Sequence, residues 1–168
     1  SKGNAFTLNE KVVVDQGKTS ETRPYRIIEV PGLQFFWFKK LIDYSANSLV
    51  SMYINGGLYT YSELTKETAV YNLGDFELSA LKACSNGDME ILAGSEGSVK
   101  LFDVGTQKII SASHANYATP VEIRWISPLV ALVCYKNGFV RNYDIRTDLK
   151  KNEVLFTNHF GISCADYN

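Results

Sequence analysis

The chain lacks the features that mark several large classes of protein. None of its apolar runs approaches the roughly 18 to 20 residues that a membrane-spanning helix needs, so we predict no membrane partner. Its three cysteines, Cys84, Cys134 and Cys164, are an odd number at wide spacing, which fits neither a disulfide framework nor a zinc site. We expect them to pack as small apolar side chains in a reducing, intracellular compartment, either cytoplasmic or nuclear.

Signals for nucleic-acid binding and for catalysis are also scarce. The net charge of −1 gives no general attraction for a phosphate backbone. The tightest basic group lies in residues 146–153, where acidic residues interrupt it, and this favours a solvated loop. Neither of the two histidines, His114 and His159, stands in a recognisable nucleophile motif, so we predict that the chain is not an enzyme.

Cofactor and metal motifs are not found either. His159 and Cys164 lie five residues apart without a second pair of metal ligands. The segment 94–98 is rich in glycine, but it has neither the lysine nor the strand-to-helix context of a phosphate-binding loop. We expect a β-turn there, in which Gly97 supplies a positive φ. No catalytic, cofactor-binding or metal-binding residue is predicted.

The sequence does contain a repeat with a regular period. Each copy is a glycine turn, an alternating strand, and an aromatic or aliphatic residue followed by a polar one. The copies are 56–62, 97–103 and 138–144, and their first glycines stand 41 residues apart. A period of about 40 to 45 residues with several strands is the signature of propeller blades.

Short alternating strands around each glycine predict an all-β protein, a β-propeller with three complete four-stranded blades and partial blades at both ends. The expected blades are 1–30 (partial), 35–73, 78–113, 121–157 and 161–168 (partial). Within the first complete blade we expect strands at 35–42, 49–54, 58–63 and 69–73. In the N-terminal partial blade, 1–9 should supply the third strand and 26–30 the outer strand. Because the chain begins at Ser1, we expect it to be part of a longer protein, whose remaining blades come from the same chain or another.

Two of the repeats resemble the WD40 repeat family. Phe102-Asp103 and Tyr143-Asp144 look like the Trp-Asp pair that ends the third strand of each blade in that family, and Ser113-His114 looks like its Gly-His pair. The resemblance implies that His114 caps a strand and that the blades form an interaction scaffold. The chain departs from the family pattern because no blade has a true Trp-Asp pair and only one has the histidine.

Aromatic residues are the most unusual local feature. Residues 35–38 read Phe-Phe-Trp-Phe, and Trp125 follows Arg124 in a predicted inner strand. Alternate residues of a strand face opposite ways, so these side chains either fill the spaces between blades or form exposed anchors for a partner. Packing between blades is the favoured interpretation.

These observations predict a non-enzymatic protein-interaction scaffold within a multiprotein complex. One alternative is a scaffold subunit of an RNA-associated complex, in ribosome assembly or RNA processing, which contacts RNA only through that complex. A weaker alternative is an enzyme or small-ligand binder that uses the propeller channel, because converging acids and histidines are not evident. If the family geometry holds, one face carries the partner-binding residues Glu96, His114, Asn116, Tyr117, Lys136 and Asn137.

Overall fold

Antiparallel strands account for almost all regular structure in the computed structural model, which describes residues 9–11, 27–30, 32–33, 39–114, 118–158 and 161–162. The chain divides into two compact units, residues 1–33 and 34–168. In the first unit, β1 (Asn9–Lys11) pairs with β2 (Ile27–Glu29). The second unit holds three four-stranded sheets. No helix in the described ranges is long and apolar enough to cross a membrane.

Each four-stranded sheet is a simple meander in which consecutive strands are neighbours. The first sheet contains β3 (Ile42–Tyr44), β4 (Leu49–Ile54), β5 (Gly57–Ser62) and β6 (Thr68–Asn72). The second contains β7 (Leu78–Ala83), β8 (Met89–Gly94), β9 (Val99–Asp103) and β10 (Lys108–Ala112). The third contains β11 (Pro120–Ser127), β12 (Val130–Tyr135), β13 (Phe139–Asp144) and β14 (Glu153–Thr157). These sheets confirm the predicted all-β architecture with three complete blades.

The repeated residues have the same structural role in each sheet. Gly56, Gly97 and Gly138 have φ values of +84°, +97° and +90°, in the left-handed region that glycine adopts without strain, and each lies in the turn between the second and third strands. The polar residue that ends each repeat, Ser62, Asp103 or Asp144, accepts a hydrogen bond in the turn that follows the third strand. The donors are the backbone N–H groups of Thr65 (3.2 Å), Thr106 (2.9 Å) and Arg146 (3.0 Å). The repeat therefore marks two turns in every sheet, the one between the second and third strands and the one after the third strand.

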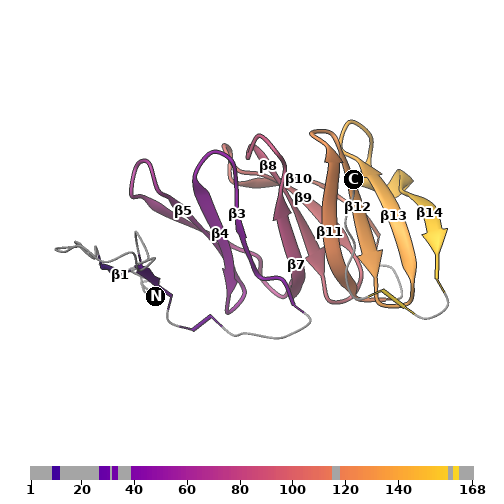
Figure 1. The fold of residues 1–168 in the computed structure, drawn as a ribbon, viewed down its shortest axis with the longest axis horizontal. Coiled ribbons are helices and arrows are strands. Elements are labelled where there is room, and N and C mark those ends of the chain that lie inside the picture. Colours follow the sequence, from indigo (N-terminus) through magenta and orange to yellow (C-terminus); the bar gives the residue numbers. More distant parts are fainter. Residues whose placement is uncertain are drawn as a thin grey trace, which may run out of the picture. The chain divides into compact units, whose positions relative to one another are not determined.

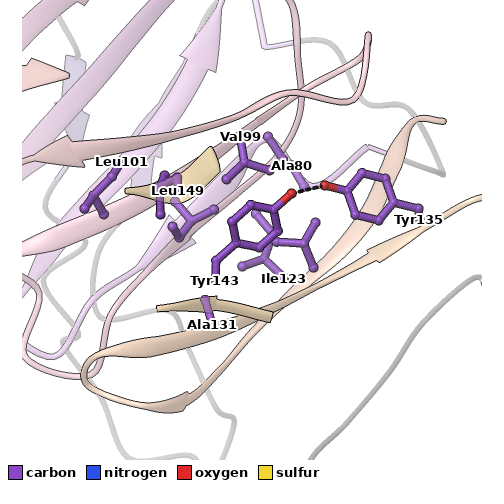
Figure 2. Packing of buried hydrophobic residues seen from close by; sticks show 11 residues of the cluster. Ala80, Val99, Leu101, Ile123, Ala131, Tyr135, Tyr143 and Leu149 are labelled. Atoms are coloured by element: carbon purple, nitrogen blue, oxygen red, sulfur yellow. Dashed lines mark hydrogen bonds between the residues drawn. The ribbon is translucent and has the colours of Figure 1, made fainter. Parts of the chain in front are cut away.

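The three sheets lie side by side, with their first strands β3, β7 and β11 adjacent (Figure 1). One core cluster lies between the second and third sheets. There Ala80, Val99 and Leu101 meet Ile123 and Tyr143 (Figure 2). A second cluster joins the first and second sheets through Leu58, Leu78 and Phe102, all nearly inaccessible to solvent. Burial of these apolar side chains between sheets is the main stabilising contribution that the sequence pattern predicts.

The first strand of the first sheet was predicted at 35–42, and these bounds are wrong. The strand that pairs with β4 is β3, Ile42–Tyr44, and residues 34–38 lie outside the described residues. The tight turn that follows β3 explains the difference, because Ser45 N–H donates to the Leu49 carbonyl (2.9 Å) and so sets the register of the hairpin. Lys40, within the predicted strand, instead forms a parallel bridge with Ala80 of β7.

The predictions for the two ends are tested only in part. Residues 27–29 form β2, inside the predicted outer strand 26–30, but its partner is 9–11, so the pairing begins where the strand 1–9 was expected to end. Residues 1–8 and 163–168 lie outside the described ranges, and Gly161 and Ile162 form no strand. The loop predicted at 146–153 contains a short 3₁₀ helix, η1 (Leu149–Lys151), capped by the Asp148 side chain.

Burial of Cys84 and Cys134 and packing of Trp125 between blades were predicted correctly. Cys84 and Cys134 are free and buried, whereas Cys164 lies outside the described residues. Trp125 packs against the core between the second and third sheets, and its indole Nε1–H donates to the Lys82 carbonyl (3.1 Å). Packing between blades is therefore its role. The aromatic residues at 35–38 lie outside the described residues.

Candidate functional site

The connections at one end of the second and third sheets lie close together, and we call them the loop face. It comprises residues 73–77, 95–98, 113–114, 118–119 and 136–138. These segments are connections before first strands or turns between second and third strands. In an antiparallel meander, alternate connections lie at the same end of the sheet, which brings these segments together.

Hydrogen bonds join the segments of the loop face, and the second of the following three crosses from one sheet to the next. Ser95 N–H donates to the Glu77 carbonyl (2.7 Å), and Thr119 Oγ1 donates to the Ser95 carbonyl (3.0 Å). Lys136 N–H then donates to the Thr119 carbonyl (2.9 Å). The turn of the second sheet is thereby fixed to the turn of the third sheet, and the loop face has a defined backbone on which side chains project.

Four of the six predicted partner-binding residues can be placed, and all four are exposed on the loop face. Glu96 accepts a hydrogen bond from Ser98 Oγ, which orients its carboxylate. Asn137 Oδ1 accepts from the Phe139 N–H (3.3 Å), and the neighbouring Lys136 extends from the same turn. His114 lies two residues after the end of β10. Asn116 and Tyr117 lie outside the described residues.

His114 does not have the capping role that the family resemblance implied. Its side chain is exposed, and the preceding residue, Ser113, is buried instead. Ser113 Oγ accepts from the Val99 N–H (2.9 Å) and donates to the His114 carbonyl (3.0 Å). A serine hydroxyl reaches both backbone groups from within the turn, so the imidazole is left on the surface.

A second group of polar residues, which the sequence analysis missed, lies where the first strands of the three sheets meet. A cavity of about 200 Å³ is lined there by charged side chains from all three sheets. Two ion pairs order them, Lys82 with Asp43 (2.5 Å) and Lys40 with Glu122. Arg124 Nε lies 3.7 Å from Glu122 Oε1. We call Lys40, Asp43, Lys82, Glu122 and Arg124 the inner charge cluster.

Two acids of this cluster, Asp43 and Glu122, line the same cavity, and no histidine is among the described residues that line it. A signal was present in Val121-Glu122-Ile123-Arg124-Trp125, where charged residues alternate with apolar ones in an inner strand. Both carboxylates have a lysine partner, which is the arrangement of a structural ion-pair network. No group of three or more His, Cys, Asp or Glu side chains that could hold a metal occurs in the described part of the chain.

A shallower hollow of about 460 Å³ lies beside the outer strands of the first and second sheets. Its lining includes three threonines and a serine, with Glu67 as the single charged residue among the described residues that line it. Such a lining offers hydroxyl groups for hydrogen bonds but neither a nucleophile–base pair nor a group of metal ligands. It adds no chemistry to that of the loop face and the inner charge cluster.

Comparison with known sequences gives one informative relative. No protein-family model matches the chain. The chain is 25% identical over 149 residues to the APC/C activator protein CDC20 of Saccharomyces cerevisiae, and the match covers 86% of this chain and 24% of the relative. The chain thus spans about a quarter of the length of the curated relative that it matches.

Solved structures show the same fold at lower sequence identity. A chain in the crystal structure of a mitotic checkpoint complex superposes with a TM-score of 0.72 at 19% identity, over 90% of this chain and 48% of that chain. The computationally designed Ika4 protein gives a TM-score of 0.64 at 13% identity, over 77% of this chain and 81% of that chain. At these identities the matches establish a shared fold.

Proposed function

We propose that this chain, a WD40-like β-propeller segment with divergent repeats, is a non-enzymatic protein-interaction scaffold within a multiprotein complex. The resemblance predicted from Phe102-Asp103 and Tyr143-Asp144 is confirmed by the sequence relative and by the structural match described above. Loops carried by a rigid scaffold are where such a fold places its binding residues. Because the fold alone does not dictate a role, the proposal depends on the loop face.

The observation that supports the proposal most strongly is the hydrogen-bonded loop face. Its backbone is fixed between two sheets through Thr119, so little conformational entropy is lost when a partner binds. Its exposed side chains include an acid, Glu96, a base, Lys136, and an amide, Asn137. Mixed charge and hydrogen-bonding groups on a rigid surface suit selective recognition of a protein surface.

The proposed partners are other protein subunits, in an intracellular compartment, cytoplasmic or nuclear. The similar proteins agree with this class of role, since one is an activator protein and the other is a chain of a checkpoint complex. Neither comparison points to RNA, so the RNA-associated alternative has no support from them. The inner charge cluster adds no support for catalysis, because its carboxylates are held by lysines.

Substitution of the loop face tests the proposal. The triple variant E96A/K136A/N137A removes three exposed side chains and the turn hydrogen bonds of Glu96 and Asn137, but it removes no core contact, so the three sheets should still form. A matched control, L64A/K66A, changes exposed residues in the turn between β5 and β6, at the opposite end of the first sheet. Protein partners that co-purify with the parent should be reduced about tenfold or more by the triple variant, since a few residues dominate most interfaces.

Two results would contradict the proposal. Unchanged co-purification by a folded triple variant would place the interaction elsewhere on the molecule. An equal loss for L64A/K66A would show that the effect is not specific to the loop face. Circular dichroism and thermal melting of both variants separate loss of binding from loss of fold.

A further inference from the structure

One fully buried carboxyl group lies between two of the sheets. Glu90, on β8, has no solvent exposure. Its Oε1 accepts a hydrogen bond from Ser51 Oγ of β4, so the side chain reaches across from the second sheet to the first. Its Oε2 is buried and has no hydrogen-bond partner among the described residues. An ionised carboxylate in such a place is energetically unfavourable. It has lost its hydrogen bonds to water and receives only one hydrogen bond, from a hydroxyl group, in exchange.

The charged groups near Glu90 do not neutralise it. From β3, Asp43 adds a like charge. Lys82 Nζ of β7 forms an ion pair with Asp43 Oδ1 (2.5 Å). The Ala83 N–H donates a hydrogen bond to Asp43 Oδ2 (2.9 Å). On β9 the residue opposite Glu90 is Phe102. Asp103 pairs with Met89 and therefore lies on the other face of the sheet.

We propose that Glu90 is a proton-operated latch between the first and second sheets. When the carboxyl group is protonated, it is neutral, remains hydrogen-bonded to Ser51, and allows the two sheets to pack. When it ionises, its charge is buried beside Asp43 without a cation of its own. The first sheet then separates more readily from the second.

The direction of the effect follows from the environment of the group. Desolvation by burial, the largest cause, and the negative charge of Asp43 raise the pKa of Glu90, whereas the hydrogen bond from Ser51 opposes them; the result is a pKa of about 7 against 4.5 for an ordinary glutamate. The folded chain therefore holds this proton more tightly than the unfolded chain. The stability that the proton contributes is complete below pH 4.5 and is lost as the pH rises to about 7.

Carbon-13 NMR of the Glu90 side-chain carboxyl in the full chain measures the titration directly. We expect a midpoint near pH 7. Ser51→Ala removes the hydrogen bond that favours the ionised form, so the midpoint should rise. Asp43→Asn removes the like charge and frees Lys82, so the midpoint should fall. A parent midpoint below pH 5, or midpoints that do not move in these opposite directions, would overturn the proposal.

Urea unfolding at several pH values tests whether the proton controls stability. Between pH 4.5 and 7 the ratio of folded to unfolded chain contributed by Glu90 should fall by up to about 300-fold, as the two pKa values require. Glu90→Gln, which is neutral at every pH, should abolish that part of the slope and should be more stable than the parent above pH 7. Glu67→Gln, an exposed control, should retain the slope.

Amide hydrogen exchange locates the effect within the fold. Raising the pH from 5.5 to 8 should reduce the protection factors of β3 to β6 relative to those of β11 to β14, after correction for the intrinsic exchange rate. A uniform change across all three sheets, or none, would contradict a latch between the first two. Glu90→Gln should remove the difference. If that variant does not fold, the comparison of the parent with Ser51→Ala still decides the question.

Discussion

Lys40, in the segment just before β3, forms an ion pair with Glu122 of β11 in the third sheet. Lys40 also bridges Ala80 of β7 in the second sheet, so its backbone and its side chain contact different sheets. The two partners differ in burial, since the side chain of Glu122 is 3% exposed and that of Lys40 is 46% exposed. Because of this difference in burial, substitution of Lys40 and substitution of Glu122 should reduce stability by different amounts.

Removal of Lys40 should destabilise the chain more than removal of Glu122. Lys40→Met leaves a buried carboxylate whose remaining ion-pair partner among the described residues is Arg124 (Nε to Oε1, 3.7 Å), and should cost about 2 kcal/mol. Glu122→Gln leaves an ammonium group that can turn to water, and should cost less than about 1 kcal/mol. Urea unfolding gives both values. The double variant should be more stable than Lys40→Met alone, and the reverse order of the single variants would contradict this account.

The paired tyrosines of the core should be energetically coupled. Tyr135 and Tyr143 lie on adjacent strands and share a hydrogen bond of 2.6 Å between their hydroxyl groups (Figure 2). Tyr143→Phe or Tyr135→Phe should each cost about 1 kcal/mol, and Tyr143→Ala about 3 to 5 kcal/mol because it also leaves a cavity. A double-mutant cycle with both phenylalanine variants should give non-additive losses. Strict additivity would show that the hydroxyl contact contributes nothing.

Two glycines with positive φ should respond differently to alanine. At Gly138 (φ +90°), an added Cβ would overlap the backbone carbonyl of Asn158, whereas at Gly74 (φ +62°) it would meet nothing within 4 Å. Gly74→Ala should therefore cost only the backbone strain, about 1 kcal/mol. Gly138→Ala adds a clash with backbone and should cost at least about twice as much. Thermal melting of the two variants compares them, and equal losses would show that the turn beside Asn158 can move.

Local patterns predicted the sheets well because each sheet is built from neighbouring segments. Gly97, in the turn between the second and third strands, and Asp103, at the turn after the third strand, each determine a hairpin locally. The period of 41 residues was therefore sufficient to predict the sheets. The register of β3 was missed because several adjacent residues fit an apolar strand equally well. There the Ser45 turn decides the pairing, and the bridge from Lys40 to Ala80 depends on the second sheet.

The candidate site was predictable only in part. The exposed positions of Glu96, Lys136 and Asn137 follow from the turns that contain them. The family pattern misled for His114, because Ser113 makes the buried hydrogen bonds. The inner charge cluster and Glu90 depend on contacts between sheets, and the sequence separates Ser51 from Glu90 by 39 residues. Only tertiary packing brings such residues together.

Site-specific photo-crosslinking on the loop face tests the central claim most directly. A photoreactive residue is introduced at Asn137, on the loop face, and, in a separate variant, at Lys66, in the turn between β5 and β6 at the opposite end of its sheet. The account predicts a discrete protein crosslink from position 137 that is lost in the background E96A/K136A, with little crosslinking from position 66. Crosslinking from position 66 alone, or crosslinking from 137 that is insensitive to E96A/K136A, would contradict a partner-binding loop face.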